Sequence, residues 1–189
     1  MIRIGIIGNI GSGKSYVAQN FGYPVFNADY EVAQLYQQDK KIFTKLKKIL
    51  PKYIQSFPVE KKEITNSILA NKNNLKKIVK IVHVEIRKKM KDFLKKHKNK
   101  KFVILDIPLL LENKINKKGD ILIFVQSKQS EIFKRLKKRQ NFNQKLLKKF
   151  KDIQYPIKYK MKKSNFIIKN DFKKRTIDNG IKSILKEIM

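Results

Sequence analysis

Cysteine is absent from the 189-residue sequence, and histidine occurs only twice, as His83 and His97. Without cysteine there is no disulfide bond, no thiol nucleophile and no thiolate metal site, and two separate histidines are too few for a histidine metal cluster. The reducing environment of the cytoplasm suits such a chain. The sequence therefore predicts a cytoplasmic protein whose chemistry depends on other side chains.

Long apolar runs are also missing. The longest, from Phe102 to Leu111, is interrupted by Asp106 and is far shorter than the roughly 20 residues that a membrane-spanning helix needs. The chain enters an apolar segment at Ile2 without a basic and then apolar leader, so we expect neither export nor membrane insertion. Its length suits one domain with a real hydrophobic core.

Acidic residues are few, with 15 Asp and Glu against 46 Lys and Arg, which gives a formal net charge of +31. Such a charge attracts polyanions, including nucleic acids, acidic membranes and nucleotides. However, 41 of the 46 basic residues are lysines, spread over nearly every expected helix and loop, and Ile and Asn are also plentiful. A drift towards AT-rich codons would produce this composition. We therefore favour a solvated lysine surface over a nucleic-acid groove and expect no specific nucleic-acid partner.

Three of the seven glycines lie close together, in Gly8-Asn9-Ile10-Gly11-Ser12-Gly13-Lys14-Ser15, which fits the phosphate-binding pattern G-x-x-x-x-G-K-[S/T] at every fixed position. An apolar strand candidate precedes it and a helical pattern follows it, as the motif requires. Glycine lets successive N–H groups converge on phosphate oxygens at a helix N-terminus. Lys14 would neutralise the β- and γ-phosphates, and the Ser15 hydroxyl would reach Mg²⁺. The segment predicts binding of a nucleoside triphosphate but does not identify the reaction.

Continuous apolar runs alternate with helical patterns along the chain. The runs lie at residues 2–7, 24–26, 101–106, 120–125 and 165–169. Five parallel strands alternating with helices define an α/β fold, here of the three-layer, P-loop type. We expect a nucleotide-binding core from about 1–30, 99–127 and 162–189, a helical acceptor-binding lobe at about 31–98, and a helical lid at about 128–161.

Two aspartates follow expected strands. Asp29 comes after the second strand and Asp106 ends the third, and the carboxyl ends of parallel strands line the ligand crevice of such a sheet. Asp29 could equally be a helix N-cap. Asp106 resembles a Walker B acid that could hold Mg²⁺ through water or orient the attacking hydroxyl, or it could cap the turn at Pro108. His83, beside an apolar helix stripe, is left undecided between a structural and a catalytic role.

Several segments together resemble the dephospho-coenzyme A kinase family, over most of the chain. They are Ile6 to Ser15, Asn27-Ala28-Asp29, the run from Asp106 to Glu112 that resembles Asp-x-Pro-Leu-Leu-Phe-Glu, the paired arginines Arg135 and Arg139, and then Gln154 and Asn170. The resemblance implies ATP-dependent, Mg²⁺-dependent phosphorylation of the ribose 3′-hydroxyl of dephospho-coenzyme A. We expect a monomer.

The resemblance also implies roles for particular residues. Asp29, Lys14 and Arg139 would be catalytic, with Asp29 accepting or orienting the hydroxyl proton and Arg139 covering the transferring charge. Ser15 and Asp106 would hold the metal ion. The positions that would bind the nucleotide are Gly8, Gly11, Ser12, Gly13, Lys14, Ser15, Tyr16, Arg135 and Asn170.

The chain departs from the family pattern at several positions. Tyr16 replaces a threonine, Asn27 an aspartate, Val84 the proline of a His-Pro pair, and Ile157 and Lys160 two lid arginines. These departures bear on the number of phosphate contacts and not on the reaction class. The alternatives are another small-molecule or nucleoside monophosphate kinase or, from a different class, a basic nucleic-acid-binding protein that uses ATP as a switch.

Overall fold

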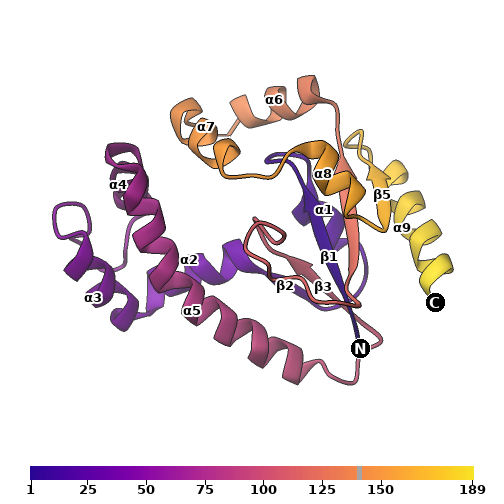
Figure 1. The fold of residues 1–189 in the computed structure, drawn as a ribbon, viewed down its shortest axis with the longest axis horizontal. Coiled ribbons are helices and arrows are strands. Elements are labelled where there is room, and N and C mark those ends of the chain that lie inside the picture. The colour runs from indigo at the N-terminus through magenta and orange to yellow at the C-terminus, as the bar shows by residue number, and fades with distance from the viewer. Residues whose placement is uncertain (140–141) are drawn as a thin grey trace. The chain divides into compact units, whose positions relative to one another are not determined.

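The computed structural model describes residues 1–139 and 142–189 (Figure 1). The chain folds into two compact units. Unit 1 contains Met1–Asn27, His97–Phe142 and Ile153–Met189, and unit 2 contains Ala28–Lys96 and Asn143–Asp152. Within the described ranges, no helix is both long and apolar enough to span a membrane.

Unit 1 is built on a five-stranded sheet in which every pairing is parallel, in the order β2-β3-β1-β4-β5. The strands are β1 (Ile2–Gly8), β2 (Val25–Asn27), β3 (Phe102–Asp106), β4 (Ile121–Gln126) and β5 (Phe166–Lys169). The predicted α/β fold with five parallel strands is confirmed. The strands are nearly continuous apolar runs because both faces of the sheet are covered.

The two faces of the sheet bury different sets of side chains. On one face Ile4 and Ile6 pack with residues of α1 (Lys14–Gln19) and α9 (Lys174–Ile188). On the other face a Cβ at Gly5 would lie 2.9 Å from Leu122 and 3.2 Å from Leu110. Leu110 belongs to the segment that follows β3, so this segment packs closely on the face opposite α1 and α9.

Unit 2 is helical. It contains α2 (Ala28–Gln38), α3 (Lys40–Ile49), α4 (Lys61–Ala70), α5 (Lys72–Lys96) and α7 (Gln144–Asp152). The apolar stripe between residues 32 and 50 is divided between α2 and α3, because the Asp39 side chain accepts hydrogen bonds from the N–H groups of Lys41 and Ile42 and caps α3. The 25-residue α5 buries Ile78, Val82 and Ile86, as the second apolar stripe predicts.

In the segment predicted as a lid, residues 128–161, the described residues 128–139 and 142–161 form three short helices. They are α6 (Gln129–Lys137), α7 and α8 (Ile157–Lys162), of which α6 and α8 belong to unit 1 and α7 to unit 2. Lys149 of α7 donates from Nζ to the carbonyl oxygens of Ile68 and Leu69 near the end of α4, at 2.8 and 3.1 Å. This places α7 firmly on α4 within unit 2. The lid function itself stays a prediction.

Candidate active site

The phosphate-binding loop connects β1 to α1 at the carboxyl edge of the sheet in unit 1. Gly13 is the N-cap of α1 and has a left-handed backbone with φ 88°. A Cβ at this position would lie only 2.4 Å from Nδ2 of Asn170. Glycine is therefore required at position 13 both by the backbone conformation and by the closeness of Asn170.

Ser127 directly follows β4 and Asn170 directly follows β5, and both side chains hydrogen-bond to the loop. The Ser12 carbonyl oxygen accepts hydrogen bonds from Asn170 Nδ2 at 2.8 Å and from Ser127 Oγ at 3.0 Å. Asn170 is buried and its Oδ1 also accepts from the N–H of Phe172 at 2.7 Å. Asn170, predicted as a nucleotide-binding position, thus lies against the loop and supports its shape.

The side chain of Ser12 tests whether the loop suits a phosphate. Its Oγ is completely buried and has no hydrogen-bond partner in the part of the chain that the structure describes. A buried hydroxyl without a partner is costly, and a phosphate oxygen in the loop would supply one. Lys14 donates from Nζ to the Asn9 carbonyl oxygen at 2.9 Å, so its ammonium lies over the same loop. Both features fit an anion held by the loop.

Asp106 lies at the end of β3, beside the loop. Its Oδ2 accepts a hydrogen bond from Asn27 Nδ2 at 2.8 Å, and its carboxyl is also hydrogen-bonded to the Ser15 side chain. Burial raises the pKa of Asp106, while the Ser15 hydrogen bond and the positive charge of Lys14 oppose that rise. The fold therefore brings together Lys14, Ser15 and Asp106, as the sequence predicts.

The Ser15 hydroxyl and the Asp106 carboxylate are oxygen ligands of the kind that Mg²⁺ prefers. Among the described residues no group of three or more His, Cys, Asp or Glu side chains forms a metal cluster. Mg²⁺ at nucleotide sites is usually held by one or two protein oxygens, the substrate phosphates and water. The pair Ser15 and Asp106 fits such an ion.

The remaining predicted residues lie in three places. Asp29 is exposed in the first turn of α2, as its second residue, so it is not the N-cap of that helix. Tyr16 is exposed on α1. Arg135, on α6, places its guanidinium over the Phe172 ring at 4.3 Å, and Arg139 is exposed in the turn that follows α6. Asp29 belongs to unit 2 and the others to unit 1.

Two contributors to this site are not predicted by the sequence. The sequence assigns Asn27 no role of its own, because it replaces an aspartate of the family pattern. In the structure Asn27 ends β2, which pairs with β3, and its amide donates a hydrogen bond to Asp106. Phe172 was not considered; it has φ 66° and lies beneath Arg135. A non-glycine residue at such a φ is uncommon, and no motif around Phe172 predicts this conformation.

His83 lies on α5 in unit 2 and is half-buried. Burial lowers its pKa, and the neighbouring positive charge of Arg87 lowers it further. The imidazole is therefore neutral at pH 7.

A parallel sheet with a phosphate-binding loop after its first strand, and an acid at the end of the neighbouring strand, defines the class of P-loop proteins that bind nucleoside triphosphates. Comparison with known proteins agrees and is more specific. The family model for dephospho-CoA kinase matches residues 2–175. The chain belongs to the dephospho-CoA kinase family.

Two relatives named dephospho-CoA kinase illustrate the similarity. That of the Wolbachia of Brugia malayi is 34% identical over 141 residues, 72% of each chain, and that of Bartonella quintana is 32% identical over 147 residues, 75% of each. A solved structure from Thermus thermophilus has a TM-score of 0.80 and 26% identity, covering 100% of this chain and 98% of its own. The dephospho-CoA kinase of Campylobacter jejuni has a TM-score of 0.63 and 22% identity, covering 98% and 96%, and shares the fold.

Proposed function

We propose that this enzyme transfers the γ-phosphoryl group of ATP to the ribose 3′-hydroxyl of dephospho-coenzyme A, giving coenzyme A and ADP. The observation that carries the proposal is the hydrogen bond between Ser15 and Asp106 beside Lys14, within the residues 2–175 that match the dephospho-CoA kinase family. The hydroxyl, the carboxylate and the ammonium are the groups that a P-loop kinase uses on the phosphates and their metal ion.

The proposed donor site is the loop of unit 1. Its N–H groups and Lys14 bind the β- and γ-phosphates, and the buried Ser12 hydroxyl gains the partner that it lacks. Ser15 and Asp106 are the protein groups that would hold Mg²⁺, which lowers the charge of the phosphates when it is bound. Arg139 and Arg135 offer guanidinium groups, which bind phosphate at two points.

The proposed acceptor groups are in unit 2. Asp29 is the carboxylate that accepts or orients the proton of the attacking hydroxyl, and most of the acceptor site comes from the helices of this unit. In phosphoryl transfer the protein mainly positions the two substrates and stabilises the charge that moves. We expect the enzyme to act as a cytoplasmic monomer.

An acceptor panel tests the proposal. ADP release is measured with ATP and Mg²⁺ and with dephospho-coenzyme A, AMP, CMP or RNA as acceptor, and the product is checked for a new ribose phosphate. We expect rapid ADP release with dephospho-coenzyme A alone. Equal or faster release with AMP or CMP would indicate a nucleoside monophosphate kinase. ADP release that depends on RNA, without phosphorylation of an acceptor, would indicate the nucleic-acid alternative.

A further inference from the structure

Lys160 stands where the family resemblance leads one to expect a lid arginine that contacts phosphate, but it is almost completely buried. Its ammonium forms an ion pair with Glu112 at 2.9 Å, and the two side chains are only 4% and 9% exposed. Both residues belong to unit 1. The charge of Lys160 is therefore already neutralised by a partner inside the protein.

The pair is part of a small network, which we call the Glu112 clasp and which consists of Glu112, Gln154, Tyr155 and Lys160. Oε1 of Glu112 accepts from the Tyr155 N–H at 2.9 Å as well as from Lys160. Lys160 Nζ also donates to Gln154 Oε1 at 3.2 Å. The clasp fastens the segment that leads into α8 to the segment that follows β3, more than 40 residues away along the chain.

The segment fastened by the clasp begins directly after Asp106. It contains two non-glycine residues with left-handed backbones, Leu109 with φ 56° and Lys114 with φ 51°. Such conformations are costly and persist only where surrounding contacts enforce them. The N–H of Asn113 donates to the Leu109 carbonyl oxygen at 2.9 Å, and the apolar side chain of Leu110 is fully buried. Glu112 lies between the two left-handed residues, so the clasp holds the most strained part of the segment.

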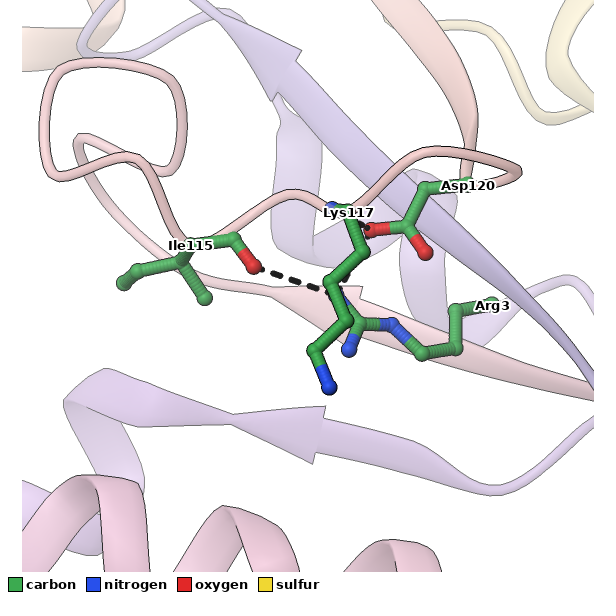
Figure 2. Close-up of polar contacts among 4 residues, drawn as sticks. All are labelled: Arg3, Ile115, Lys117 and Asp120. Carbon is green, nitrogen blue, oxygen red and sulfur yellow. Dashed lines mark hydrogen bonds and ion pairs between the residues drawn. The ribbon is translucent and has the colours of Figure 1, made fainter.

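The far end of the same segment is held by a second buried ion pair (Figure 2). Arg3 Nη2 contacts Asp120 Oδ2 at 2.6 Å and the Ile115 carbonyl oxygen at 3.1 Å, and the paired side chains are 9% and 6% exposed. Asp120 also accepts from the N–H of Lys117 at 2.8 Å. Arg3 and Asp120 lie at the starts of β1 and β4, at the amino edge of the sheet, whereas Asp106 lies at the carboxyl edge.

A phosphate-binding role for Lys160 would conflict with this arrangement. To reach a phosphate, Lys160 would have to leave Glu112, and the carboxylate would then stay buried without its cation. Breaking a buried pair in this way is strongly unfavourable. In contrast, Glu112 lies only six residues after Asp106. A fixed pair between Glu112 and Lys160 is therefore well placed to hold the direction in which the backbone leaves Asp106.

We propose that Glu112 and Lys160 are positioning residues for the phosphoryl transfer. Their pair fixes the segment after Asp106 against the segment that leads into α8, and Lys160 does not bind the transferred phosphate. This inference rests on the proposed function of the loop and Asp106, and it adds a role for two residues outside that site. A small displacement of a group that orients substrate is enough to slow a reaction greatly.

A double-mutant cycle tests the proposal, with Glu112→Gln, Lys160→Met and the double variant, assayed by ADP release with dephospho-coenzyme A. We expect each single change to lower kcat by about tenfold or more, with a smaller change in KM for ATP, because Asp106 is displaced while the loop stays intact. The double variant should be no slower than the slower single variant, since both changes remove one interaction. Lys160→Arg should restore much of the activity, because it keeps the charge.

A phosphate-binding role for Lys160 predicts a different result for the same variants. If Lys160 binds phosphate, Glu112→Gln frees it and leaves kcat unchanged or higher, and the two changes add. That result would overturn the proposal, and Glu112→Gln alone gives it if Lys160→Met does not fold. Amide hydrogen exchange of residues 107–115 is a readout that needs no substrate: we expect faster exchange in both single variants. It separates failure of the clasp from failure of the proposed reaction, which the wild-type acceptor panel decides.

The pair of Arg3 and Asp120 supplies a matched control, since it has similar burial and holds the far end of the same segment, at the amino edge of the sheet. We expect Asp120→Asn to lower the melting temperature as Glu112→Gln does, but to leave kcat within about twofold when both proteins are folded. An equal loss of kcat in Asp120→Asn would mean that any loosening of this segment slows the enzyme, and the specific role of the clasp would be rejected.

Discussion

At the scale of single residues, Lys14 has the clearest expected role. Its ammonium lies over the loop, at 2.9 Å from the Asn9 carbonyl oxygen, and contributes no core packing. We expect Lys14→Ala to reduce turnover to less than a tenth of wild type, because contacts to a transferring phosphoryl group contribute several kcal/mol at the transition state. The melting temperature should change little. A variant that keeps more activity than this would exclude the role.

Asp29 gives a second test at this scale. In α2 it is the second residue, so as a purely structural group it would only favour the helix N-terminus, an effect of about 0.3–1 kcal/mol. As the group that orients the hydroxyl it needs its negative charge. We therefore expect Asp29→Asn to lower kcat by about 100-fold or more, with nearly unchanged ATP affinity.

The same Asp29→Asn sample serves for kcat, ATP binding and the melting temperature. A normal kcat with a lowered melting temperature would return Asp29 to a structural role. Asp106 would then be the best remaining carboxylate, since it lies beside Lys14 and Ser15. Glu31→Gln, in the same first turn of α2, removes a charge at this helix end together with the ion pair to Lys89 at 2.9 Å, and as a control it should leave kcat unchanged.

At the scale of elements, the start of α4 depends on one carboxylate. Burial alone would raise the pKa of Glu63, but hydrogen bonds from the N–H groups of Gln55, Ser56 and Glu60 outweigh burial and lower it below 4.5. The ionised form is thus favoured by folding. Its contribution is present above the unfolded pKa of Glu63 and is lost as the pH falls through the lower, folded pKa.

We therefore expect Glu63→Gln to lower the melting temperature at pH 7 and to have a smaller effect in acid, as the pH falls through the lowered pKa of Glu63 and the wild type also loses this charge. Thermal unfolding of both proteins across this pH range measures the difference. The exposed Glu187 of α9 provides the control, since Glu187→Gln should have little effect at either pH. If the difference in melting temperature between Glu63→Gln and wild type stays constant with pH, the stabilising role of the ionised Glu63 carboxylate is wrong.

At the scale of the whole molecule, part of the lysine excess has a structural explanation. Basic residues occupy the last turns of α3, α5, α6, α7, α8 and α9. Positive charge in these turns interacts favourably with the negative end of the helix dipole. Apart from the buried Lys160, these basic residues are distributed over both units, as we expect for a solvated surface rather than one binding groove.

This distribution leads to a prediction about salt. We expect the apparent affinity for dephospho-coenzyme A to fall only moderately with added salt, and an RNA competitor to inhibit weakly at near-physiological ionic strength, where charges are screened beyond about 8 Å. Steady-state kinetics across a salt series, with and without RNA, measure both effects. Nanomolar affinity for RNA, with the steep salt dependence of counterion release, would instead favour a nucleic-acid partner.

Local patterns of residues are sufficient to predict the phosphate-binding loop, the five strands and the family. Each of these depends on local patterns: the spacing of glycines before Lys14, apolar runs long enough for buried strands, and short motifs such as that from Asp106 to Glu112. Such patterns are fixed by backbone conformation and by burial of consecutive residues, so they can be recognised before the chain is folded.

Contacts between residues that are distant in the sequence depend on how the folded chain packs. Asn27 donates to Asp106 across 79 positions because their strands are neighbours in the sheet. Lys160 pairs with Glu112 in the interior, and Lys149 joins α7 to unit 2 although the sequence groups α7 with the lid. The periodicity of a segment shows which face is apolar but not what covers it. The partner of a lysine is set by packing, so one residue type can serve as solvated surface, helix cap or buried ion pair.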